Sequence, residues 1–191
     1  MSNRGPVALL DANVLYSATV RDLLLTLAEA DLLVPHWTEE IHNEWISNLL
    51  RKRPDLDSAA LARTRAQMDA AFPKALVSGY QRHIPAVQLP DPADAHVVAA
   101  AIEAGADVIV TFNLRHFPPS SLHALGIVAV DPDRVVLELL RTESRRCCDA
   151  IARRRQRFRN PPLTAEQFLA SLERANLAKT SLRLRDLVDR I

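Results

Sequence analysis

The stretch of this sequence that most constrains its fold is residues 89–117, LPDPADAHVVAAAIEAGADVIVTFNLRHF. Asp91 is followed by proline, a pair typical of a helix N-cap and first turn. Small and apolar residues continue the helix to Gly105, which suits a helix C-terminus. A β-rich run at 108–111 comes next, with Asn113 just beyond it. A carboxylate-led helix beside a strand that ends on a polar side chain predicts a ligand site at the carboxyl ends of an open α/β sheet.

The rest of the chain continues this alternation of strands and helices through residue 130. Strands are predicted at 7–10, 31–37, 108–111 and 127–130, and helices at 15–30, 38–50, 57–71 and 91–105. Such alternation predicts a mostly parallel sheet flanked by helices on both sides. From residue 135 the pattern is helical, with a break at 160–162. We therefore expect an α/β domain over 5–132 and a helical C-terminal extension over 133–191.

Charge is distributed unevenly along the 191 residues, although the net charge is only +1. Residues 1–130 carry 10 Lys+Arg against 14 Asp+Glu, whereas residues 131–191 carry 14 against 9. This asymmetry indicates either a cation-binding site plus a polyanion-binding surface, or two solvated faces. The cysteines, Cys147 and Cys148, form neither a disulfide framework nor a zinc spacing, which favours a reducing compartment. Because no apolar stretch reaches the roughly 18 residues of a membrane span, we expect a cytoplasmic protein.

Three carboxylates and an amide stand at equivalent ends of the predicted elements. They are Asp11 after the first strand, Glu44 on the helix after the second, Asp94 at a helix start, and Asn113. A carboxylate at a buried strand end is costly unless it is paired or binds a metal, although Asp11 could instead cap the next helix, as Asn13 could. Converging carboxylates repel one another unless a cation lies between them. Hard oxygen donors predict Mg²⁺ or Mn²⁺ rather than zinc, and such an ion activates water for phosphodiester hydrolysis.

The sequence resembles the PIN-domain ribonucleases, including bacterial VapC-type toxins. The matching pieces are VALLDANVLYS at 7–17, TEEIHNEW at 38–45, residues 91–117 and GIVAVDP at 126–132, with 159–177 resembling the extension of a longer subgroup. The resemblance implies Mg²⁺- or Mn²⁺-dependent RNA cleavage and a cognate antitoxin. It also implies that Asp11, Glu44, Asp94 and Asn113 are the site residues.

The fourth site position departs from the family pattern, in which aspartate is common. Asn113 can ligate through its carbonyl oxygen but adds no charge, so we expect a second metal ion to bind more weakly. Asp91 either compensates as a ligand or serves as the N-cap. Thr111 either binds a carboxylate or phosphate or is structural. His96 and His116 are interpreted as hydrogen-bonded bystanders rather than proton donors.

The C-terminal extension contains an arginine-rich segment at 141–159, with eight arginines against two acids. Arg145, Arg146, Arg153 and Arg154 are the candidate RNA phosphate contacts, whose affinity would fall with salt. The same segment could dock an acidic antitoxin or form a solvated face.

Two other functions compete with the ribonuclease. One is a catalytically weak or inactive module of the same fold that binds RNA or a partner protein. The other, an aspartyl-phosphate hydrolase with Asp11 as nucleophile, is disfavoured because position 13 is Asn where that chemistry needs Asp. We also expect a homodimer, because the apolar tail helices need a surface to cover.

Overall fold

The computed structural model describes residues 4–157 and 163–191, so the helix break predicted at 160–162 lies outside the described residues. Contacts divide the chain into two compact units. Residues 6–16 and 34–130 form what we call the sheet unit, and residues 17–33 and 131–191 belong to what we call the helical unit. None of the described helices is long and apolar enough to cross a bilayer.

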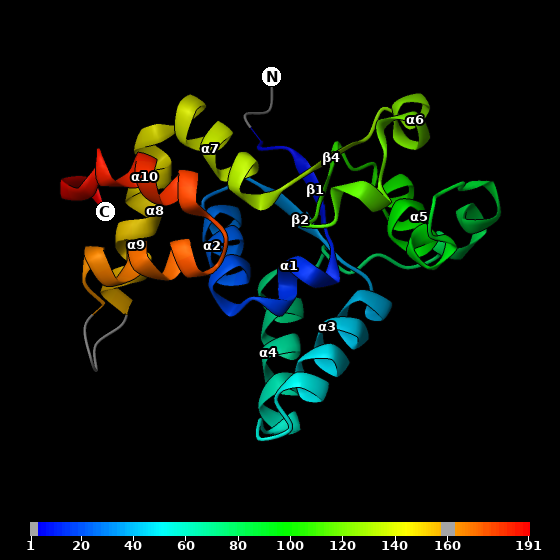
Figure 1. Ribbon diagram of the computed structural model, residues 1–191, viewed down its shortest axis with the longest axis horizontal. Helices are drawn as coiled ribbons and strands as arrows, with labels where there is room; N and C mark the ends of the chain where they lie inside the picture. Colours follow the sequence, from blue (N-terminus) through cyan, green and yellow to red (C-terminus); the bar gives the residue numbers. More distant parts are fainter. Residues whose placement is uncertain (1–3, 158–162) are drawn as a thin grey trace. The chain divides into compact units, whose positions relative to one another are not determined.

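The sheet unit is built on four parallel strands (Figure 1), which confirms the predicted α/β fold. These are β1 (Val7–Leu10), β2 (Val34–His36), β3 (Val108–Val110) and β4 (Val128–Val130), in the order β2-β1-β3-β4. Strand β2 is shorter than the predicted 31–37, because Asp31 has a positive φ of 56° in the preceding turn. The register pairs Leu10 with Val110, so β1 and β3 end at the same level.

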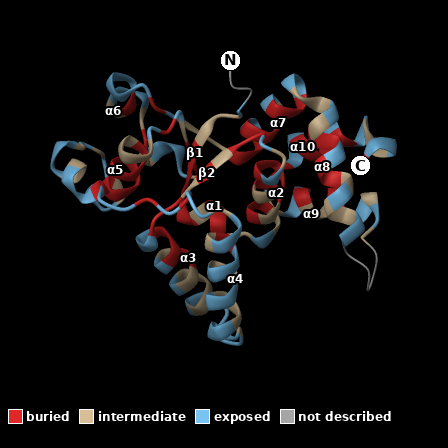
Figure 2. Ribbon diagram, turned by 180° about the vertical axis from the view of Figure 1, so that it is seen from behind, coloured by how far each residue is buried: buried red, intermediate tan, exposed pale blue. Residues whose placement is uncertain are grey.

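Helices and short 3₁₀ turns complete the sheet unit. They are α1 (Ala12–Tyr16), α3 (Glu39–Lys52), α4 (Ser58–Ala71), α5 (Ala95–Ala104), α6 (Pro119–Leu122) and 3₁₀ turns at Tyr80–Ala86, Pro92–Asp94, Leu114–His116 and His123–Leu125. Helix α5 is buried from Ala95 to Ala101, as expected for a stripe of small residues packed in the core, whereas α4 buries only Met68 (Figure 2). Thr38 and Asp57 cap α3 and α4 through their side chains.

The helical unit joins α2 (Ala18–Glu29) to the C-terminal helices. These are α7 (Pro132–Thr142), α8 (Ser144–Arg157), α9 (Ala165–Arg174), α10 (Ala178–Arg185) and a 3₁₀ turn at Val188–Arg190. The helix predicted over 15–30 is present but begins later, at Ala18. The chain ends α1 at Tyr16 and restarts at α2, because the Ser17 side chain accepts a hydrogen bond from the backbone N–H of Val20 and so forms a new N-cap.

Candidate metal centre

Asp11 is held at the end of β1 by residues on two segments. Its backbone N–H donates to the carbonyl of Val110 (3.1 Å), which continues the ladder and places Thr111 beside it. The Thr111 hydroxyl donates to Asp11 Oδ2 (2.7 Å), and Asn13 Nδ2 donates to the same oxygen (2.5 Å). The Asn13 carbonyl oxygen in turn accepts from the N–H of Phe112 (3.0 Å). Thr111 and Asn13 therefore fix the orientation of the Asp11 carboxylate.

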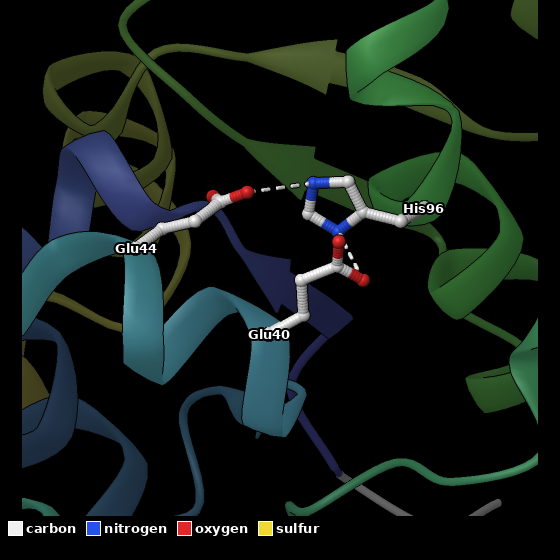
Figure 3. A group of neighbouring side chains, drawn as sticks. All are labelled: Glu40, Glu44 and His96. Atoms are coloured by element: carbon white, nitrogen blue, oxygen red, sulfur yellow. Dashed lines mark ion pairs between the residues drawn. The ribbon is translucent and has the colours of Figure 1, made fainter. Parts of the chain in front are cut away.

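Glu44 projects from α3 towards a buried histidine on α5 (Figure 3). His96 is only 5% exposed, and its Nε2 lies 3.0 Å from Glu44 Oε1. Its other ring nitrogen, Nδ1, faces Glu40 Oε2 at 3.6 Å, and Glu40 also accepts from the Tyr80 hydroxyl (2.9 Å). Burial disfavours the imidazolium, yet the hydrogen bond and charge of Glu44, with the charge of Glu40, raise the pKa of His96 overall. The histidine thus partly neutralises and orients Glu44.

Asp94 lies at the junction between a 3₁₀ turn and α5. Asp91 caps that turn, because its Oδ1 accepts from the N–H of Ala93 (3.0 Å). His116, from the turn after β3, places Nδ1 2.8 Å from Asp94 Oδ2. Each of the three candidate carboxylates is therefore braced on one of its oxygens by a neighbouring side chain, an arrangement typical of metal ligands.

All four predicted site residues line a single cavity of about 340 Å³ in the sheet unit. Its lining consists of Asp11, Ala12, Asn13, Tyr16, Glu44, Asn48, Arg51, Lys52, Asp94 and Asn113. Asp91 is not among the lining residues; it lies within 4.8 Å of Asp94 and His116, measured between ligand atoms. A second cluster of this kind, Glu40–Glu44–His96, contains Glu44. Asp11 belongs to neither cluster. The three candidate carboxylates therefore line one cavity without all of their oxygens lying within 4.8 Å of one another.

The electrostatics of the cavity suit a cation. Asp11 is 6% exposed, and burial raises the pKa of its carboxyl, with further contributions from the negative charges of Asp94 and Glu44. Hydrogen bonds from Thr111 and the backbone of Ala12 oppose this rise without cancelling it. A buried carboxylate with two acidic neighbours is stabilised when a divalent ion shares the space. The donors are carboxylate and amide oxygens, which fit Mg²⁺ or Mn²⁺.

Comparison with known proteins shows to which family the chain belongs. The family model described as "PIN domain" matches residues 7–115, more than half of the chain. The chain belongs to the PIN-domain family. Residues 132–186 match the family model described as "VapC50 C-terminal domain". The family resemblance and the C-terminal extension expected from the sequence are both confirmed.

One relative of this PIN-domain chain is named "Putative ribonuclease VapC50", from Mycobacterium tuberculosis. It is 37% identical over 79 residues, which cover 41% of this chain and 47% of the relative. The match thus spans about half the length of that relative. No solved structure matches the chain.

The structure gives several residues near the cavity roles that the sequence did not predict. The sequence predicts a helix cap for Asn13 and hydrogen-bonded bystanders for His96 and His116. In the structure the Asn13 amide donates to Asp11, and the two histidines contact the carboxylates of Glu44 and Asp94. The only sequence signal for the histidines was their closeness in the chain to Asp94 and Asn113. Their partners lie on other elements, so contact could be found only in the folded chain.

The predicted RNA-binding arginines lie on α8 in the helical unit. Arg146 donates to the backbone carbonyl of Ala30 (2.7 Å), and Arg154 pairs with Asp22 (2.6 Å). Both therefore bind α2 or the turn after it. Arg145 and Arg153 are exposed, with no ion pair among the described residues. Two of the four candidates thus have structural partners, and whether α8 binds RNA remains a prediction.

Proposed function

We propose that this chain is a metal-dependent endoribonuclease that hydrolyses RNA phosphodiester bonds, with residues 5–132 as nuclease domain and 133–191 as helical extension. One observation carries the proposal: in a PIN-domain chain, Asp11, Glu44, Asp94 and Asn113 line a single cavity. The name of the mycobacterial relative supports ribonuclease chemistry.

In this proposal the four side chains hold Mg²⁺ or Mn²⁺ through oxygen donors. When bound, such an ion positions the phosphodiester and lowers the pKa of the attacking water. The chain itself supplies orientation. Thr111 and Asn13 hold Asp11 Oδ2, and His96 holds Glu44 Oε1. Rigid support of this kind limits the reorganisation needed when metal and substrate bind.

The first test replaces one candidate ligand and measures both binding and cleavage. Asp94→Asn keeps the size of the side chain but removes a charge from the cavity, so we expect Mn²⁺ binding by calorimetry and Mn²⁺-dependent cleavage of a labelled RNA to fall to background. Asp57→Asn, an exposed helix cap outside the cavity, is the matched control and should behave as wild type. Cleavage that persists in Asp94→Asn, from a nuclease-free preparation with an unchanged melting temperature, contradicts the assignment.

The proposal extends to the partners implied by the family resemblance. The chain would act as the toxin of a toxin–antitoxin pair, neutralised by a cognate antitoxin, in the cytoplasm and as a homodimer. If a neighbouring gene encodes the antitoxin, its co-expression should relieve growth arrest caused by the wild type. Growth arrest by Asp94→Asn as strong as that by wild type would argue against cleavage as its cause.

A further inference from the structure

The cavity that holds the four candidate ligands also has a basic wall, contributed by the last turn of α3. Asn48, Arg51 and Lys52 line it together with Glu44. Residues four, seven and eight positions after Glu44 lie on the same face of a helix. One face of α3 thus presents the Glu44 carboxylate and, further along the helix, the cations Arg51 and Lys52 to the same cavity.

Both cations are held by neutral groups. Arg51 Nη2 donates to Asn48 Oδ1 (2.8 Å), and the Lys52 ammonium lies 5.4 Å from the centroid of the Tyr16 ring, a cation–π contact. Neither forms an ion pair within the part of the chain that the structure describes. The neighbouring Arg53, by contrast, pairs with Asp55 at 2.6 Å. No ion pair among the described residues therefore neutralises Arg51 or Lys52 at the cavity wall.

Attraction of cations to a helix C-terminus explains why basic residues lie in the last turn of α3. It does not explain why two of them line the acidic cavity while the third pairs outside it. Placing cations beside a metal site would weaken metal binding unless a negatively charged ligand also enters. The substrate of the proposed reaction is such a ligand, since every nucleotide of RNA carries a phosphate.

We infer that Arg51 and Lys52 bind backbone phosphates of a single-stranded RNA that lies along α3, with its scissile phosphate at the Glu44 end of the cavity. This inference rests on the proposed function. The rise of an α-helix places Lys52 about 12 Å along the axis from Glu44, which fits contact with a neighbouring phosphate rather than the scissile one. Asn48 and Tyr16 are positioning residues that orient the two cations. The phosphate contacts of the nuclease would then lie on α3 rather than on α8.

The test is the salt dependence of RNA binding. A fluorescein-labelled single-stranded RNA is titrated with protein in EDTA between 50 and 200 mM KCl, and anisotropy gives the affinity while a gel confirms that the RNA stays intact. Each phosphate contact to a single strand contributes about −0.7 to the slope of log affinity against log salt. Over this fourfold range one contact accounts for an about 2.6-fold loss of affinity.

We expect Arg51→Gln and Lys52→Gln each to make the slope about 0.7 shallower, and the double variant about 1.4. Arg51→Lys keeps the charge and should retain the wild-type slope. The matched controls are Arg145→Gln and Arg153→Gln, exposed arginines of α8, which should also retain it. Thermal melts of every variant report whether the fold is intact.

The inference is overturned by a wild-type slope in the Arg51/Lys52 double variant, or by a slope that becomes shallower only in the α8 variants. Absence of RNA binding by the wild type would also overturn it. Cleavage measured separately in Mn²⁺ distinguishes this failure from that of the proposed function. If the wild type cleaves RNA but the double variant has the wild-type slope, the proposed nuclease function stands and RNA binding along α3 is refuted. A changed slope without cleavage supports the RNA-binding module.

Discussion

Asp11→Asn is expected to stabilise the metal-free protein while removing metal binding. Asp11 is 6% exposed, and its two side-chain hydrogen bonds, from Thr111 and Asn13, both fall on Oδ2. An asparagine whose amide oxygen takes that position keeps both bonds and removes the buried charge. Relief of such functional-site strain commonly yields about 1 kcal/mol, which corresponds to a rise of about 3 °C in melting temperature for a chain of this size.

The pH dependence of this gain follows from the raised pKa of Asp11. Between the ordinary value of 3.8 and the raised pKa, the folded state binds more protons than the unfolded state, so wild-type stability falls as pH rises through that interval. The asparagine variant lacks this loss. Its advantage in the free energy of unfolding should therefore be small near pH 4, grow as pH rises and then level off.

Urea unfolding in EDTA across this pH range, followed by circular dichroism, measures the advantage directly. Asp57→Asn replaces an exposed N-cap aspartate with an equally good cap and should show no such pH-dependent gain. Addition of Mn²⁺ should stabilise wild type through binding to the folded state and leave Asp11→Asn unchanged. An asparagine variant that is no more stable than wild type at neutral pH would refute the reasoning, because it would mean that the Asp11 charge is already compensated within the protein.

Two further predictions concern the helical unit. Asp133 is buried on α7 and accepts from the backbone N–H groups of Lys179 (3.1 Å) and Thr180 (2.7 Å) at the start of α10. Asp133→Ala should therefore lower the free energy of unfolding, measured in urea, by about 2 kcal/mol. A loss below about 0.5 kcal/mol would contradict this capping role. Cys147 and Cys148 are buried, and burial raises the pKa of Cys147 to about 12. Both thiols should therefore be unreactive towards a disulfide reagent in the native protein at pH 8, and should react once guanidinium unfolds the chain. Rapid labelling of the native chain would contradict their burial.

Much of the fold could be predicted because its signals are local. Thr38, Asp57 and Asp131 each cap the helix that follows, and Thr164 forms a capping box with Gln167. A cap needs only a side chain and the next backbone turn, so the sequence contains the whole interaction. The break at Ser17 is hidden from periodicity because the apolar pattern continues on both sides of it, and only the capping side chain marks it.

The residues of the candidate site could likewise be predicted where the signal is local, but not where it depends on contacts between distant segments. Asp11, Asp94 and Asn113 could be proposed because each stands next to the start or end of an element, and parallel strands bring such ends to one edge. Glu44 lies inside α3, and it was proposed from its place on the helix after the second strand and from the family resemblance. The bracing contacts could not be predicted. The residue pairs Thr111–Asp11 and His96–Glu44 join segments 100 and 52 positions apart, and the depth at which a histidine is buried depends on packing around α5.

The charge asymmetry along the chain was the weakest guide to function, and the structure shows why. Division at residue 130 separates the arginines of α8 from α2, although both belong to the helical unit. Within that unit Arg154 pairs with Asp22 and Arg157 pairs with Glu29, so part of the positive charge counted in the tail is neutralised by acids counted in the front half. Arg51 and Lys52 are a smaller cluster in a region of net negative charge, yet they line the same cavity as the candidate ligands without an ion-pair partner in the described structure. For a polyanionic substrate, unneutralised cations beside the reacting centre matter more than the number of arginines in a segment, because a cation already paired with an internal carboxylate displaces fewer of the counterions condensed on the RNA.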